Sequence, residues 1–225
     1  MTPTSAYANR KGDRLPSVTE IIGHVWNKEG LIHWAWLEGK QGRDYRKSRD
    51  GAARVGTIAH ELCLYTLGGP EPEGEGFGSG KHQVAARGRA ARELEFYKKA
   101  LFCRGHFETW HRGKDLKSEL IETPLISEKL GFGGTPDWYG EWDNVKTVID
   151  IKTGRRAPEH KAQMGGYREL LVANGYEVDR LVLLYIPKEL KGSASTIIME
   201  GESIDVAVRS FKACMELFDC RMIIG

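Results

Sequence analysis

Long apolar runs are missing from the sequence, and nothing in it approaches the roughly 18 consecutive apolar residues that a membrane-spanning helix requires. The polar N-terminus also lacks the apolar segment of a secretory signal peptide. We therefore expect a soluble protein of the cytoplasm that has no membrane partner.

Cysteine is scarce, and the four cysteines form no C-x-x-C pair. This spacing argues against a zinc site and a disulfide framework, and it predicts buried, reduced thiols. A large excess of charge is also absent, because 33 basic and 31 acidic residues leave a net charge of only +2. Any basic surface must be local, and the candidates are residues 43–49 and the basic residues between Lys81 and Arg104. The alternative for both clusters is an ordinary solvated face.

The length of 225 residues suits one domain with a buried core, and we found no internal repeat. Helical spacing and cap residues predict a short helix from Ser17 and longer helices over 51–67, 82–103, 158–175 and 203–223. Strands are predicted over 118–127, 132–142, 145–152, 180–187 and 194–199. We expect a single domain, 1–225: a mainly helical part (1–112) with a flexible Gly-rich loop at 68–80, then an α/β or α+β core (113–225) with a mixed sheet flanked by helices.

The predicted strand over 145–152, VKTVIDIK, combines apolar residues with charge. Alternation places Asp150 and Lys152 on one face and Ile149 and Ile151 on the other. The apolar run is typical of a strand covered on both faces, where a charge needs a partner. The alternative is a solvated ion pair on an edge strand.

A second carboxylate, Asp137, precedes this strand. Two carboxylates about 4 Å apart repel by roughly 4 kcal/mol at an effective dielectric near 20, so a site that holds Asp137 and Asp150 together must protonate one or bind a cation. Such oxygen ligands suit Mg²⁺ or Mn²⁺, and the carbonyl of Ile151 offers another. Lys152 beside the ion is placed to hold an attacking water or to stabilise charge on a phosphoryl oxygen, as phosphodiester hydrolysis requires.

The motif Pro136-Asp137, twelve further residues, and Asp150-Ile151-Lys152 resembles the PD-(D/E)XK signature of the restriction-endonuclease-like nuclease superfamily. The longer string GTPD…DIKTG…QMGGY, preceded by VGTIAH at 55–60, is similar to the branch typified by the RecB nuclease domain. The resemblance extends from about residue 54 to 167, roughly half of the chain.

The resemblance implies a role for each matching residue. Asp137, Asp150 and His60 are metal ligands, and Lys152 positions or activates the water. Gln163 and Tyr167 line the groove and hold a phosphate or the lysine, and Glu122 is an acid that contributes in only some relatives. Each of these residues also has a structural alternative. His60 could be a hydrogen-bonded histidine of the core, Gln163 and Tyr167 could be ordinary surface side chains of a helix, and Glu122 could be a charged residue on an edge strand.

The implied function is a Mg²⁺-dependent deoxyribonuclease, for which Mn²⁺ can substitute, and more specifically an exonuclease that acts on linear DNA ends in recombination, repair or viral DNA processing. A stand-alone nuclease of this size is also typical of phages, and it would then work in the host cytoplasm. The implied partners are single- or double-stranded DNA ends and a single-strand annealing or binding protein. No iron–sulfur cluster is expected, because only Cys214 and Cys220 lie near the C-terminus.

Two other functions stay open at this point. One is a structure-selective or restriction-type endonuclease, which uses the same chemistry on an internal bond. The other is a non-catalytic nucleic-acid-binding or inhibitory protein that retains the fold. The three charges of Asp137, Asp150 and Lys152 argue against the second, because charges in a covered sheet are costly to keep.

Overall fold

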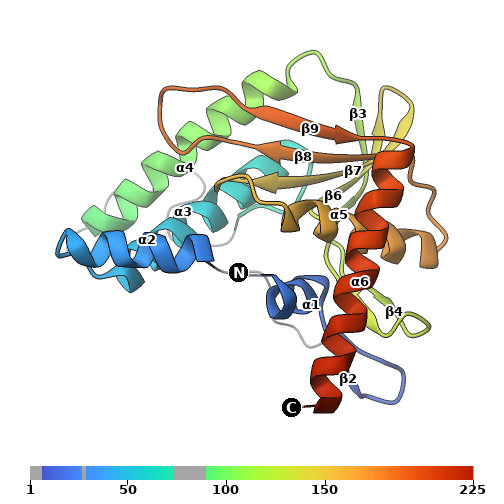
Figure 1. The fold of residues 1–225 in the computed structure, drawn as a ribbon. Helices are drawn as coiled ribbons and strands as arrows, with labels where there is room; N and C mark the ends of the chain where they lie inside the picture. The colour runs from blue at the N-terminus through green and yellow to red at the C-terminus, as the bar shows by residue number, and fades with distance from the viewer. Residues whose placement is uncertain (1–6, 27–28, 73–89, 225) are drawn as a thin grey trace. The chain divides into compact units, whose positions relative to one another are not determined.

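The computed structural model describes residues 7–26, 29–72 and 90–224. The chain divides into two compact units, which Figure 1 draws as ribbons. The sheet unit comprises Met1–Trp26, Gly113–Tyr185 and Ser195–Gly225, and the helical unit comprises Asn27–Arg112 and Ile186–Ala194. A single domain over 1–225 stays a prediction.

A five-stranded mixed sheet forms the centre of the sheet unit, in the order β3-β6-β7-β8-β9. Its strands are β3 (Leu116–Ile121), β6 (Trp138–Trp142), β7 (Val145–Lys152), β8 (Arg180–Tyr185) and β9 (Ser195–Met199). Neighbouring strands are antiparallel except for β7 and β8, which are parallel. A parallel pair needs a crossover, and the helix α5 (Glu159–Ala173) provides it. The α/β fold with a mixed sheet flanked by helices is therefore confirmed.

Three helices share one hydrophobic core with the sheet: α1 (Val18–Val25), α5 and α6 (Glu202–Ile224). Figure 1 shows α5 and α6 beside each other next to the strands. The two helices approach closely because α5 carries Gly165, where a Cβ atom would lie 2.2 Å from the carbonyl oxygen of Ala207 on α6. The Ser17 hydroxyl caps α1 by accepting from the Glu20 N–H at 3.0 Å, as the sequence predicts.

Two predicted strands are each broken into two. The run 118–127 bends at Glu122, whose φ of 44° is incompatible with a continuous strand, so β3 ends there and β4 (Leu125–Ser127) begins a separate hairpin. The run 132–142 breaks at Thr135–Asp137 into β5 (Phe132–Gly134), the partner of β4, and β6. The hairpin β4–β5 is thus inserted into the predicted meander, which consists of β3, β6 and β7.

The helical unit contains α2 (Glu29–Lys40), α3 (Tyr45–Thr66) and α4 (Ala90–His111). The sequence did not predict α2, and α3 begins before the predicted residue 51 because Asp44 caps it. The helix α4 continues past the predicted end at Cys103, whereas 82–89 and most of the predicted loop 68–80 lie outside the described residues. A two-stranded sheet of β1 (Tyr7–Ala8) and β2 (Arg14–Leu15), also not predicted, belongs to the sheet unit.

The cysteines agree with the prediction at three positions of four. Cys63, Cys103 and Cys214 are buried free thiols, whereas Cys220 near the end of α6 is exposed. The prediction of burial is wrong for Cys220 because the last turns of α6 extend beyond the core. Among the described helices, none is both long and apolar enough to cross a membrane.

Candidate active site

The strand β7 is buried along its centre, from Thr147 to Ile151. Residues on both of its faces are buried, as its composition predicts, and Asp150 is only 1% exposed. The ammonium of Lys152 lies 2.7 Å from Oδ2 of Asp150, and the side chain of Lys152 is 20% exposed. The pair is therefore a buried ion pair at the carboxyl end of a central strand, and the solvated edge-strand alternative is wrong.

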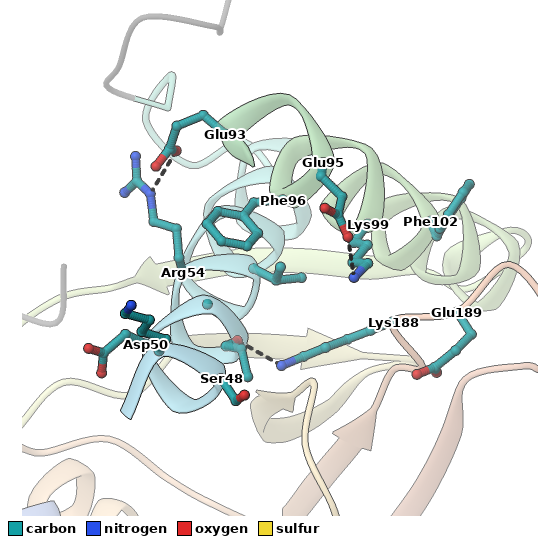
Figure 2. Close-up of a pocket in the computed structure, with 14 residues that line it drawn as sticks. Ser48, Asp50, Arg54, Glu93, Glu95, Phe96, Lys99, Phe102, Lys188 and Glu189 are labelled. Carbon is teal, nitrogen blue, oxygen red and sulfur yellow. Dashed lines mark hydrogen bonds and ion pairs between the residues drawn. The ribbon is translucent and has the colours of Figure 1, made fainter. Parts of the chain in front are cut away.

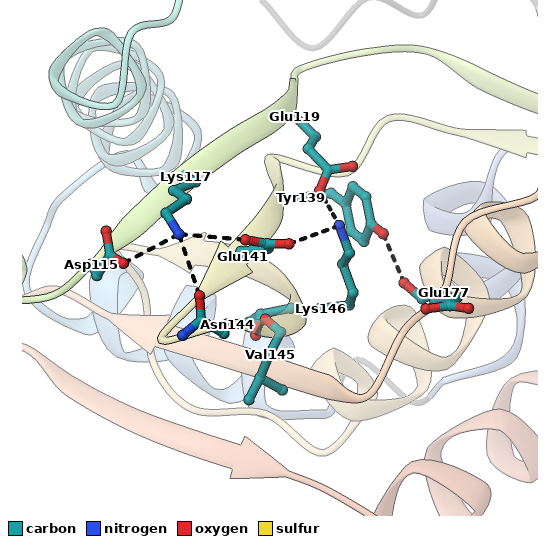
Figure 3. Close-up of polar contacts among 10 residues, drawn as sticks. Asp115, Lys117, Glu119, Tyr139, Glu141, Asn144, Val145, Lys146 and Glu177 are labelled. Atoms are coloured by element: carbon teal, nitrogen blue, oxygen red, sulfur yellow. Dashed lines mark hydrogen bonds and ion pairs between the residues drawn. The ribbon is translucent and has the colours of Figure 1, made fainter.

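The opposite end of β7 carries charge of a different kind. Lys146 lies 2.5 Å from Glu119 on β3 and 3.2 Å from Glu141 on β6, and Glu141 also faces Lys117. Figure 3 shows this ladder of alternating charge across three strands. These carboxylates, Glu119 first, raise the pKa of Lys146. Opposite charges on paired strands stabilise the register, so we assign this ladder a structural role.

The helix α5 presents a row of polar side chains to Lys152. Lys152 Nζ donates to Oε1 of Gln163 at 2.9 Å, and Nε2 of Gln163 donates to the hydroxyl of Tyr167 at 2.8 Å. One hydrogen-bonded chain therefore runs from Asp150 through Lys152 and Gln163 to Tyr167, and the roles of the two α5 residues stay predictions.

The electrostatics of this chain keep Lys152 protonated and Tyr167 neutral. Burial lowers the pKa of Lys152, but the carboxylates of Asp150 and Asp137 outweigh burial, so the net pKa is raised. Burial also raises the pKa of Tyr167, and the same two carboxylates raise it further. Both carboxylates therefore act on the protonation of both residues.

The turn before β6 positions Asp137 beside β7. Its Oδ2 accepts a hydrogen bond from the backbone N–H of Ile151 at 2.7 Å, which ties the half-buried carboxylate to the residue between Asp150 and Lys152. The Glu122 N–H donates to the Asp137 carbonyl at 3.0 Å, so the backbone at Glu122 borders the site. The role of the Glu122 side chain stays a prediction.

The donor set of this site fits a hard divalent cation. Mg²⁺ is commonly held by one or two carboxylates while it keeps several waters, and Asp137 and Asp150 supply two beside the carbonyl of Ile151. Among the described residues, no group of three or more His, Cys, Asp or Glu side chains converges. Two carboxylates of this kind could hold Mg²⁺ or Mn²⁺, which accept oxygen ligands. His60 is a half-buried residue of α3 in the helical unit, and its role as a ligand stays a prediction.

The predicted basic clusters belong to the helical unit. In the segment 43–49, Arg43 donates two hydrogen bonds to Glu38, at 2.6 and 2.8 Å, and Arg49 lies 2.8 Å from Asp50. In the second cluster, Lys81, Arg87 and Arg89 lie outside the described residues. Contacts between these clusters and DNA stay a prediction.

A hollow of about 930 Å³ lies in the helical unit between α3, α4 and the segment 186–194. Figure 2 shows that charged side chains line it together with Phe96. Four basic and four acidic residues line it, and the pairs include Lys99 with Glu95 at 2.8 Å and Arg54 with Glu93 at 3.3 Å. The basic and acidic residues balance, so the hollow offers no excess of positive charge for a phosphate.

Two residues next to Lys152 were missed from the sequence. Tyr185 of β8 is the register partner of Lys152, and its hydroxyl lies 2.9 Å from Nδ1 of His160 on α5. The position of His160, three residues before Gln163, is a signal that could have found it, since both lie on one face of a helix. No local signal could have found Tyr185, because only the parallel pairing of β7 and β8 brings it to the site.

Comparisons with known proteins found similar solved structures but no matching family model or curated protein. Similar solved structures include the alkaline exonuclease LHK-Exo from Laribacter hongkongensis (18% identity, 74% of this chain and 85% of that chain, TM-score 0.32). Others are LHK-Exo in complex with dAMP (18%, 76% and 87%, 0.32) and SSO0001 (16%, 72% and 84%, 0.30). These are distant similarities in sequence and in structure.

Proposed function

We propose that the chain is a metal-dependent deoxyribonuclease that hydrolyses phosphodiester bonds, and that it acts as an exonuclease on linear DNA ends. The observation that carries this proposal is the buried chain of Asp150, Lys152, Gln163 and Tyr167 with Asp137 beside it. Apolar residues of similar volume commonly stabilise a buried strand as well as an ion pair does, which favours a functional reason for keeping this pair.

Each residue of the site has a defined task in such a reaction. Asp137 and Asp150, with the carbonyl of Ile151, would hold Mg²⁺ or Mn²⁺, which supplies Lewis-acid stabilisation of a phosphoryl oxygen when bound. Lys152 keeps its proton, so it donates hydrogen bonds to an attacking water or to a developing negative charge. Gln163 restrains the ammonium of Lys152 by accepting from it.

Tyr167 fixes the orientation of Gln163. Because the tyrosine hydroxyl accepts from Nε2 of Gln163, the amide must present its oxygen to Lys152. Tyr167→Phe should therefore lower kcat by releasing Gln163, while the substrate KM changes little. The expected loss is about fivefold, which corresponds to about 1 kcal/mol for one neutral hydrogen bond.

Linear and covalently closed DNA separate the two enzymatic functions. With Mg²⁺ present, we expect linear DNA to be degraded progressively to short products while single- and double-stranded closed circles survive. Cutting of closed circles that depends on Lys152 would establish an endonuclease instead. No cleavage of any DNA by protein that binds Mg²⁺ in calorimetry would overturn the enzymatic proposal.

The matched variants are Lys152→Met and Lys161→Met. Lys161 is an exposed residue of α5, nine positions further along the chain, and its side chain takes part in no ion pair among the described residues. Lys152→Met should abolish cleavage, whereas Lys161→Met should retain it. Equal activity of the two variants would remove Lys152 from the mechanism.

A further inference from the structure

We propose that Arg156, together with Tyr185 and Ser195, forms a phosphate-binding subsite for the DNA phosphate next to the one that is cleaved. This inference rests on the proposed function, because it assigns a neighbouring phosphate to the same site. It begins from a row of side chains that the sheet builds at its carboxyl edge.

The row runs across three adjacent strands. Lys152 of β7 is the register partner of Tyr185 on β8, and Tyr185 is in turn the register partner of Ser195 on β9. Register partners place their side chains on the same face of a sheet, and neighbouring strands lie about 4.8 Å apart. Ser195 is therefore two strands, or about 10 Å, from Lys152, with the ring of Tyr185 between them.

Arg156 reaches across this row from the loop between β7 and α5. Its Nη2 donates to Oγ of Ser195 at 2.9 Å, and its guanidinium lies over the ring of Tyr185, 5.3 Å from the centroid. Arg156 is exposed, and within the described part of the chain it forms no ion pair with a carboxylate. The guanidinium is thus oriented by neutral groups while its charge stays available to a ligand.

The loop that carries Arg156 is itself held in place. The hydroxyl of Tyr185 and Nδ1 of His160, at the start of α5, share a hydrogen bond at 2.9 Å. Burial and the Lys152 charge lower the pKa of His160 to about 4, so the imidazole is neutral near pH 7. Tyr185 pairs with Lys152 at one end of the loop and hydrogen bonds with His160 at the other, so it holds both ends of the segment that carries Arg156.

The geometry suits a phosphate better than a base or a carboxylate metabolite. A guanidinium offers a planar fork of donors that matches phosphate oxygens, and one face of the Arg156 fork is already positioned by the aromatic ring. Arg156 is hydrogen bonded to Ser195, two strands from Lys152, so a phosphate held by its guanidinium is a different one from the phosphate at Lys152. A polymer with regularly spaced phosphates reaches both cations, which selects a DNA strand.

The test compares Arg156→Gln with Arg155→Gln. Arg155 is the adjacent residue, also exposed, and its side chain forms no hydrogen bond or ion pair with the described residues. The dissociation constant of a fluorescently labelled single-stranded oligonucleotide is measured by anisotropy at several salt concentrations, in EDTA to prevent cleavage. Arg156→Gln should weaken binding about tenfold, as expected for loss of a charge-assisted hydrogen bond. It should also reduce the slope of log affinity against log salt by about 0.7, the value for one phosphate on a single strand.

Two further variants separate positioning from charge. Arg156→Lys should keep the salt slope but not the full affinity, because an ammonium lacks the fork. Ser195→Ala keeps the charge and removes its anchor, so affinity should fall about threefold, as expected for the ordering of one long side chain, at an unchanged slope. Thermal melts of all variants should coincide with that of the wild type, since Arg156 is exposed.

The outcomes are distinguishable from failure of the proposed function. Equal affinities and slopes for Arg156→Gln and Arg155→Gln would overturn the subsite, whether or not the wild type cleaves DNA. If the Arg156→Gln defect is present but the wild type with Mg²⁺ cleaves no DNA, the subsite stands and the nuclease proposal fails. If cleavage is observed, Arg156→Gln should raise KM with little change in kcat, because the contact is made equally before and during the reaction.

Discussion

Removing the charge of Lys152 should destabilise the protein as well as inactivate it. The substitution Lys152→Met deletes the ammonium that lies 2.7 Å from an Asp150 carboxylate that is 1% exposed. Deleting one partner of a buried ion pair costs about 3–5 kcal/mol, because the remaining charge stays buried. Since the Lys152 side chain is 20% exposed and water screens part of the interaction, we take the lower end, about 3 kcal/mol.

The assay is thermal and urea unfolding in EDTA, so that bound metal does not replace the lost positive charge. For a chain of this size, about 3 kcal/mol corresponds to a Tm lower by about 6–12 °C. The exposed Lys161→Met variant should melt within about 1–2 °C of the wild type, because surface substitutions change stability by about 0.5 kcal/mol or less. The double variant Asp150→Asn/Lys152→Met should recover about half of the loss, because no unbalanced charge is left at this pair.

A Lys152→Met protein as stable as the wild type in EDTA would refute this reasoning. It would mean that Asp150 is either protonated or solvated in the native state, in conflict with its burial. Additive losses in the double variant would mean that the two side chains are not energetically coupled.

Three other perturbations test the site and its support. Mg²⁺ or Mn²⁺ added to metal-free protein should raise the Tm, and the gain in stability should be about 2.7 kcal/mol when the free metal concentration is a hundred times Kd. Asp150→Asn should abolish this rise in Tm. A rise of the same size in the variant would show that Asp150 is not a metal ligand. Gly165→Ala should lower the free energy of unfolding by about 1–3 kcal/mol in denaturant titrations, because its Cβ would lie 2.2 Å from the Ala207 carbonyl oxygen. The control Gly105→Ala has open space around its Cβ, so it should be neutral or stabilising. The pKa of His160 is lowered to about 4, chiefly by burial. As the pH falls below about 6.5, this histidine therefore binds a proton in the unfolded chain but not in the folded chain. The stability of the folded protein should thus decrease between pH 6.5 and pH 4. The full pKa shift of His160 corresponds to about 3 kcal/mol of stability, and solvent screening of the half-buried ring reduces this to about 1–2 kcal/mol. His160→Gln should remove this part of the pH dependence, which urea titrations at pH 7 and pH 5 measure.

The sequence by itself determined the strand and the helix that carry most of the candidate site, and which of their residues share a face. Alternation along 145–152 placed Asp150 and Lys152 on one face, and the apolar run predicted burial, because a strand with a period of two and no polar face must be covered. Helical spacing likewise placed Gln163 and Tyr167 on one side of α5. These are local properties, and local steric rules decide them.

The pattern of apolar and polar residues did not predict where strands break. The residues at 118–127 have strand-like composition throughout, yet Glu122 adopts a φ of 44° and sends the chain into a separate hairpin. This conformation is stabilised by contacts to another part of the chain, among them the hydrogen bond from the Glu122 N–H to the Asp137 carbonyl. A window of neighbouring residues contains no information about such a contact.

Only the tertiary structure decided which residues surround Lys152. The parallel pairing of β7 and β8 places Tyr185 beside it, although 33 positions separate them in the chain. The antiparallel pairing of β8 and β9 then adds Ser195, the residue to which Arg156 is bound. Strand order and register depend on the packing of α5 and α6 against the sheet, which is a property of the whole core, so the row from Lys152 to Ser195 exists only after the chain has folded.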